Sequence, residues 1–359
     1  MRPQIGDREH MKSERNYGID LLRLVLMYMV CMLHTLGQGG ILNACEAGSA
    51  EYNVFWFMEI LAYCAVDGFA IISGYTAVDK PRKFEKLADM WFQVFFYSFI
   101  ITAVLTAVGL NPDWNVKELI KCAMPVTFDR FWYFTAYFAL FFAIPVLNKF
   151  IFAADEKTAR TAFLLLVALF SCIEFLEGSF KLQGGYCALW LMVLYCIGAL
   201  AKRGRIFEQK KSITLIAVWA VCILATWYDR AVLGIGRLMN YVSPTILASG
   251  LIMVVLFSRL RLKGAVISKL SPLAFGIYLF HLNPVIWKNL QGGAVLAAKT
   301  NIAVGVMCAL AIAGIIFLSG LIVESLRVRL AKLMRIPELS CRIVALAKCV
   351  LKKALIILN

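Results

Sequence analysis

Long runs of apolar residues recur along the whole chain, and short polar segments separate them. Most runs are about as long as the stretch that an α-helix needs to cross the hydrocarbon core of a bilayer. Several are a little shorter, which suits helices packed inside a bundle. The pattern predicts an all-α polytopic membrane protein with about ten transmembrane helices, over residues 18–38, 54–78, 87–109, 131–147, 161–177, 186–201, 212–228, 241–258, 270–287 and 302–326.

The composition agrees with this prediction. Hydrophobic residues make up 61% of the 359 residues and charged residues 16%, whereas a soluble domain has about 45–50% and about 25%. A soluble enzyme, a disordered tail and a disulfide scaffold are therefore excluded. Most cysteines lie inside apolar runs and no CxxC or Cys/His pair has metal-ligand spacing, so we expect no metal, no structural disulfide and no permanently bound cofactor.

The distribution of basic residues predicts the orientation. The termini and alternate loops hold 28 of the 37 Lys and Arg residues, and the other loops hold eight. By the positive-inside rule both termini lie in the cytoplasm, and the net charge of +15 reflects membrane topology rather than a nucleic-acid partner. We expect a cytoplasmic arm (1–17), a ten-helix domain in the cytoplasmic membrane (18–326) and a basic amphipathic cytoplasmic tail (327–359). The tail lies on the inner leaflet of the bilayer and is broken at Pro337.

Two ionisable residues of the first span are candidates for chemistry. Arg23 and His34 are eleven residues apart, so they share one helix face at a separation of about 16 Å along the axis. A guanidinium on the cytoplasmic side can hold an anionic group of a ligand, and an imidazole further out can act as a general base. The alternative is structural: a buried arginine paired with a carboxylate, and a histidine hydrogen-bonded within the bundle.

Depth along the second span gives each of these residues a possible partner. At about 1.5 Å per residue, Glu59 lies at the depth of His34 and Asp67 at the depth of Arg23. Glu59 can then orient or acidify the imidazole, and Asp67 can neutralise the guanidinium. Both pairings are hypotheses.

Further candidates lie in other spans. His281 is either a second catalytic or binding group, or the donor that satisfies a carbonyl freed by Pro284. Trp132 and Tyr133 are either interfacial anchors or part of an outward pocket that stacks on sugars. On the inner side, Ser73 and Tyr75 precede a cationic loop that suits phosphate groups, with Lys80, Arg82 and Lys83.

Several motifs occur together in a fixed order: Gly18–Arg23 with His34, Phe69–Tyr75, Phe131–Phe134 with Pro145–Asn148, and Tyr278–His281. This combination resembles the acyltransferase family 3 membrane proteins, in particular a branch common in Gram-positive bacteria. The likeness runs from about residue 15 to 326. Each motif alone is weak, but four in order in a protein of about ten spans are fairly specific.

The resemblance implies transfer of an acyl group, usually acetyl, from cytoplasmic acyl-CoA to a hydroxyl of a cell-surface carbohydrate or another acceptor. It implies that Arg23 helps to hold the CoA donor and that His34 is the base or acyl relay. The loop cations after Tyr75 would contact the CoA phosphates, although the family usually has arginines where this chain has Lys80, Arg82 and Lys83. No soluble domain follows the last span, so we expect direct transfer or a separate extracytoplasmic acceptor protein.

A second function remains open. The same membrane fold resembles the membrane domain of membrane-bound serine racemases, which is associated with serine uptake. The chain can therefore be a free-standing transporter of a small serine-like solute, with its site at a helix broken near Pro244 or Pro284. Acyl-CoA-dependent product formation would favour the enzyme, and solute flux without acyl-CoA would favour the transporter.

Overall fold

The structure is a computed structural model that describes residues 15–77, 83–112 and 114–358. Helices make up 78% of the chain, and the described residues contain no strand. Within the described ranges, seven helical segments are long and apolar enough to cross a membrane. The prediction of an all-α polytopic membrane protein is therefore confirmed.

The seven long segments often combine several helical elements. They are α1 (Tyr17–Leu36) with α2 (Ile41–Ala44), α3 (Ala50–Tyr63) with α4 (Ala65–Ala77), α5 (Phe84–Phe95) with π-helical η1 (Phe96–Ile101) and α6 (Thr102–Ala107), α8 (Trp132–Ala153), α9 (Glu156–Val167) with η2 (Ala168–Ile173) and α10 (Glu174–Glu177), α12 (Ser212–Trp227) with η4 (Tyr228–Val232), and α17 (Ile302–Leu333).

The remaining elements include one strongly bent pair. The helical segment Ala265–His281 meets Pro284–Lys299 at an angle of 73°. This pair comprises α14 (Ala265–Leu270), η5 (Ser271–Leu273), α15 (Ala274–His281), α16 (Pro284–Leu290) and η6 (Val295–Lys299). The others are α7 (Val116–Ala123), η3 (Gln183–Gly185), α11 (Ala188–Arg203), α13 (Pro244–Ser258) and α18 (Ile336–Leu358).

Each of the ten predicted ranges overlaps a helical segment of the structure. Seven pass as spans by length and composition, and the bent pair makes an eighth. The other two, α11 and α13, have 16 and 15 residues, which is short for the hydrocarbon thickness. The count of ten and the cytoplasmic position of the termini therefore stay predictions.

The C-terminal tail contains the helix break that the sequence predicts near Pro337. α17 continues past the predicted end of its span to Leu333, and α18 then runs from Ile336 to Leu358. Pro337 lies in the first turn of α18, where its missing N–H removes no helical hydrogen bond. The break therefore lies between Leu333 and Ile336, directly before Pro337. α18 packs against α5, with Lys348 Nζ 3.1 Å from Glu85 Oε1.

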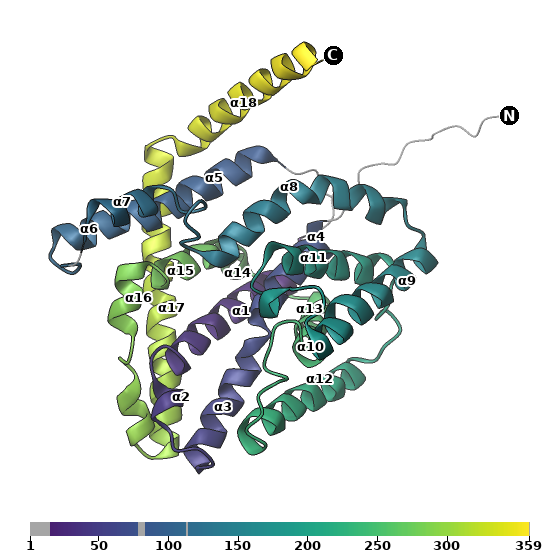
Figure 1. The fold of residues 1–359 in the computed structure, drawn as a ribbon, viewed down its shortest axis with the longest axis vertical. Coiled ribbons are helices and arrows are strands. Elements are labelled where there is room, and N and C mark those ends of the chain that lie inside the picture. Colours follow the sequence, from purple (N-terminus) through teal and green to yellow (C-terminus); the bar gives the residue numbers. More distant parts are fainter. Residues whose placement is uncertain (1–14, 78–82, 113, 359) are drawn as a thin grey trace.

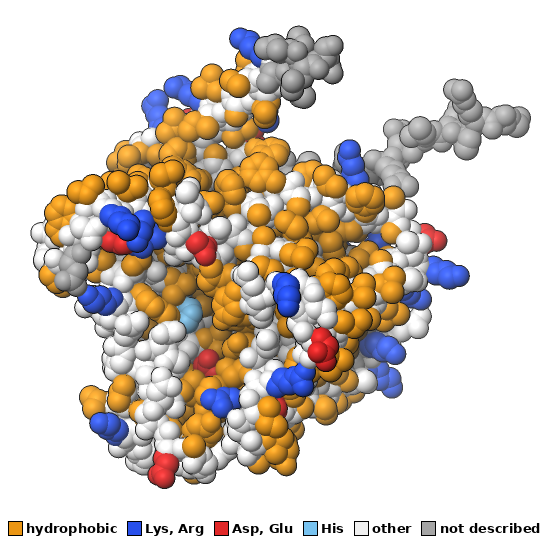
Figure 2. Space-filling view, in the orientation of Figure 1, with side chains coloured by type: hydrophobic (Ala, Val, Ile, Leu, Met, Phe, Trp, Pro, Cys, Tyr) orange, Lys and Arg blue, Asp and Glu red, His pale blue; other side chains and the backbone are white. Residues whose placement is uncertain are grey.

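The first two spans form the centre of the bundle. Their most apolar windows are 61% and 67% buried, against 22–28% for the other five long segments. Figure 1 shows α1 crossing the middle of the molecule, with α17 on one side and α11 and α13 on the other. The outer helices expose many large apolar side chains (Figure 2), as lipid-facing surfaces do. Residues of α1 are therefore placed to line an internal site.

Glycines allow α4 and α11 to approach closely. A Cβ atom at Gly74 would overlap the carbonyl oxygen of Tyr195, and one at Gly198 would overlap that of Ile71. Small residues at such crossings let helix backbones touch within a membrane. The glycine of the Ser73–Tyr75 motif thus has a packing role.

We expect Gly74→Ala to lower the free energy of unfolding by about 1–3 kcal/mol, because the added methyl meets backbone that cannot move aside cheaply. The unfolding midpoint in detergent measures this. Gly314→Ala on α17 is the control, since a Cβ there has no neighbour within 4 Å and alanine is the better helix former. Equal midpoints for the two variants would contradict the expectation.

Candidate functional site

The two described histidines form a pair, although 247 positions separate them in the chain. His34 lies in the last turn of α1, and His281 is the last residue of α15. The His34 Nδ1 atom is 2.8 Å from His281 Nε2, which is hydrogen-bonding distance. His281 is fully buried, whereas His34 is partly exposed. A histidine side chain is visible inside a hollow of the molecular surface in Figure 2.

A backbone carbonyl determines the roles of the four ring nitrogens. His281 Nδ1 lies 2.6 Å from the carbonyl oxygen of Ile277, which can only accept a hydrogen bond, so Nδ1 donates. With both rings uncharged, His281 Nε2 then carries a lone pair and accepts the N–H of His34 Nδ1. This arrangement leaves the lone pair of His34 on Nε2, the nitrogen that a general base needs.

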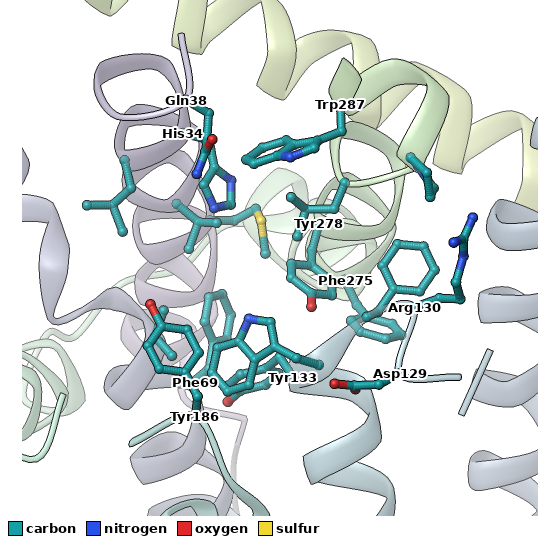
Figure 3. A pocket seen from close by; sticks show the side chains of 18 of the residues that line it. His34, Gln38, Phe69, Asp129, Arg130, Tyr133, Tyr186, Phe275, Tyr278 and Trp287 are labelled. Carbon is teal, nitrogen blue, oxygen red and sulfur yellow. The ribbon is translucent and has the colours of Figure 1, made fainter. Parts of the chain in front are cut away.

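A cavity of about 480 Å³ opens beside His34, and its volume is in the range of small-molecule sites. Figure 3 shows the His34 ring between Gln38 and Trp287 at one end, and Tyr133 and Tyr186 toward the other. The Trp287 ring lies edge-on to the His34 ring, with centroids 4.8 Å apart. The Tyr278 hydroxyl and the Asp129 carboxylate point into the space between the two ends (Figure 3).

The wall away from His34 is aromatic. The Trp132 ring lies 4.7 Å from the Tyr186 ring and 6.5 Å from the Tyr241 ring, centroid to centroid. All three residues line the cavity, together with Tyr133. Aromatic faces next to a polar base suit a ligand that combines apolar ring faces with hydroxyl groups. This favours the pocket interpretation of Trp132 and Tyr133 over that of interfacial anchors alone.

One face of α1 leads from the cavity toward Arg23. Arg23, Met27, Val30 and His34 follow one another at helical spacing, and the last three line the cavity. Arg23 Nη1 is 2.8 Å from Asp20 Oδ1. Asp20 also accepts from Arg15 and from the Ser271 hydroxyl. The guanidinium therefore lies about one turn below the cavity and is partly neutralised.

Comparison with known proteins agrees with this geometry. The family model of the acyltransferase domain matches residues 16–323, most of the chain. The chain belongs to acyltransferase family 3. It is a multi-pass membrane acyltransferase. No curated protein and no solved structure matches it.

In this acyltransferase the two predicted carboxylate pairings are not the ones that the structure shows. His34 pairs with His281 instead of Glu59, and Arg23 pairs with Asp20 instead of Asp67. Glu59 is buried, and its Oε2 has no hydrogen-bond partner. Asp67 accepts from Trp190 Nε1 at 3.1 Å. Helical rise predicts the depth of a residue but not the direction of its side chain, and α3 and α4 meet at a break near Cys64.

Ser73 and Tyr75, two of the predicted phosphate-binding residues, do not line the cavity beside His34. The Ser73 hydroxyl donates to the Phe69 carbonyl of its own helix, and the Tyr75 hydroxyl lies 3.2 Å from Ser258 Oγ. Lys83 is exposed just before α5, while Lys80 and Arg82 lie outside the described residues. A CoA-binding role for these residues stays a prediction.

The sequence analysis does not identify four residues that lie at or near the site: Asp20, Gln38, Trp287 and Asn283. Helical spacing from Arg23 and His34 points to the first two, which lie at i−3 and i+4. Trp287 reaches His34 only because the chain bends between α15 and α16. No pattern in the sequence indicates that contact.

Asn283 braces this bend and is fully buried. Its Nδ2 donates to the Tyr97 carbonyl at 2.7 Å and to Thr102 Oγ1 at 2.9 Å. Its Oδ1 accepts from the backbone N–H groups of Val285 and Ile286, which caps α16. The side chain thereby connects the turn after His281 to η1 and α6. Backbone groups near the break are therefore hydrogen-bonded by the Asn283 side chain as well as by that of His281.

We expect Asn283→Asp to lower kcat for acyl transfer about tenfold with little change in the KM for the acyl donor, because the aspartate keeps the cap but loses both donated bonds. The pH profile of kcat should change as well, since the His34–His281 contact is displaced. Asn289→Ala is the control, because Asn289 lies on α16 and its Nδ2 donates to the Val285 carbonyl of the same helix. Equal loss in both variants would indicate a general defect of α16.

Proposed function

We propose that this acyltransferase moves an acyl group, most simply acetyl, from cytoplasmic acyl-CoA to a hydroxyl of a cell-surface carbohydrate. The observation that carries the proposal is the His34–His281 pair, whose free Nε2 faces a cavity with an aromatic wall. A base beside such a wall suits a sugar hydroxyl held by stacking of the ring.

The reaction needs one positioned base. His34 Nε2 removes the proton of the acceptor hydroxyl while its oxygen attacks the thioester carbonyl carbon. The C–S bond then breaks, the new C–O ester bond remains, and the proton returns from His34 to the CoA sulfur. His281 keeps the His34 ring in the tautomer that leaves Nε2 free.

The donor is expected to approach from the cytoplasmic side along the face of α1. Arg23 lies on that face, one turn before Met27 and the cavity. Its guanidinium suits an anionic or carbonyl group of the donor. Acyl-CoA enters this proposal as a substrate, with no permanently bound cofactor, and a glycan or a separate extracytoplasmic protein receives the acyl group.

Inverted membrane vesicles supplied with acetyl-labelled acetyl-CoA and loaded with a cell-surface glycan fraction test the proposal. Vesicles that contain the protein should move label from CoA to the lumenal glycan, and vesicles without it should not. Label that stays on CoA, together with serine uptake by proteoliposomes lacking acyl-CoA, would overturn the proposal in favour of transport. The broken α15–α16 pair is the feature on which that alternative rests.

A further inference from the structure

A second cavity borders the one beside His34. It measures about 620 Å³ and lies between α6, the segment around α7, and α16. Arg130 and Pro284 belong to the walls of both cavities. The outer cavity therefore adjoins the His34 cavity at these two residues.

The lining of the outer cavity is mostly apolar but includes several polar side chains and one large exposed ring. Trp114 is 54% exposed and lines it, next to Asn111 and Asn115. Asn111 Nδ2 donates to Thr106 Oγ1 at 3.0 Å, and the Asn115 side chain caps α7. An indole face beside amides and hydroxyls offers both stacking and hydrogen bonds.

A charged group stands where the two cavities meet. Arg130 Nη1 is 3.1 Å from Glu118 Oε2, and Lys121 Nζ is 2.6 Å from Glu118 Oε1. The hydrogen bond from Lys121, with Arg130 close by, lowers the pKa of Glu118 below its ordinary value, so the carboxylate stays charged. Arg130 Nε is buried without a partner. A wall that combines these charged groups with apolar surface suits a sugar, which has both hydroxyl groups and apolar ring faces.

The sides of α7 differ in what they face. Val116 and Ile120, one turn apart, are 66% and 51% exposed, whereas Asn115, Glu118, Leu119 and Cys122 line the cavity. Val116 therefore lies on the side of α7 that faces away from the cavity, and Glu118 lies on the side that faces it.

We propose that the outer cavity binds a second sugar residue of an oligomeric carbohydrate acceptor while the residue that is acylated lies against His34. Trp114 stacks on the second residue, and the Arg130–Glu118 pair binds its hydroxyl groups at the junction. The enzyme then favours a polymer over a single sugar. This inference rests on the proposed acyl transfer to carbohydrate.

Kinetics with acceptors of two lengths test the inference. The acceptors are a tetrasaccharide and a monosaccharide released from the glycan fraction that the transfer assay labels. Trp114→Ala should lower the ratio of the tetrasaccharide kcat/KM to the monosaccharide kcat/KM about tenfold. Val116→Ala, which alters the outward side of α7, should keep the ratio. An unchanged ratio in Trp114→Ala would overturn the inference while leaving the transfer reaction established.

A binding measurement separates this site from turnover. In a His34→Ala background, Asn111→Cys places a thiol in the outer cavity and Val116→Cys places one outside it. The tetrasaccharide should slow maleimide labelling at position 111 but not at 116, measured above the native cysteines, and the monosaccharide should protect less. Equal labelling with and without tetrasaccharide overturns the inference. Absence of any glycan acylation by the unmodified protein overturns the proposed function as well.

Discussion

Replacing His34 with alanine is expected to lower kcat for acyl transfer by about 10²–10⁴-fold, the usual contribution of a positioned general base. The acceptor hydroxyl is a weak nucleophile until a base removes its proton. His34 lines the cavity, and its hydrogen bond to His281 leaves the lone pair on Nε2 available for this step. The KM for acyl-CoA should change little, because Arg23 lies about 16 Å away along α1. Initial rates of label transfer in vesicles, normalised to folded protein, measure the effect.

The control for this experiment is His10→Ala, which removes a histidine from the predicted N-terminal arm. It should transfer label at the rate of the unmodified protein. Retention of more than about a tenth of the rate in His34→Ala would show that the base lies elsewhere.

The second large effect is expected at His281. His281→Ala should lower kcat by about 10²-fold, because the His34 ring loses the acceptor that holds its Nδ1–H and leaves Nε2 free. His281→Gln should recover part of the rate, since a side-chain carbonyl can accept that N–H. A positioning role predicts that kcat falls while the KM for acyl-CoA stays near its original value.

Histidine labelled with ¹⁵N gives a direct measurement of the same point, because the sequence contains only three histidines. The unmodified protein should show the Nε2–unprotonated tautomer for both His34 and His281, and His281→Ala should shift His34 toward the other tautomer. The double variant should be no slower than His34→Ala alone, because the two residues act as one unit. Additive losses would contradict a coupled pair.

Local physics made much of the fold predictable. A run of apolar residues must form a helix in lipid, because no water is present to bind free backbone groups. The ten predicted ranges therefore each fall on a helical segment. Their ends were harder to predict, since α5 begins before its predicted range and α17 continues well beyond. The helix break near Pro337 was predictable, because proline disfavours a helix interior but fits the first turn of a new helix.

The candidate site was likewise predictable only in part. Helical geometry alone places Arg23 and His34 on one face of α1, and the structure adds Met27 and Val30 between them on that face. Depth alone could not choose their partners. Asp20 was predictable as the partner of Arg23, because it lies three residues before it on the same helix. Glu59 and Asp67 were chosen by their depth in the membrane, and their side chains do not form the expected pairs.

What the sequence determined by itself is an α-helical membrane acyltransferase of family 3 with a histidine and an arginine on one face of its first span, because these follow from geometry within one helix and from ordered motifs. Only the tertiary structure joined His34 to His281, turned Trp287 onto the same ring and set Trp132 across the cavity. These contacts depend on the 73° bend that Asn283 braces and on close packing at Gly74. Such long-range geometry has no period along the chain, so no local pattern can encode it.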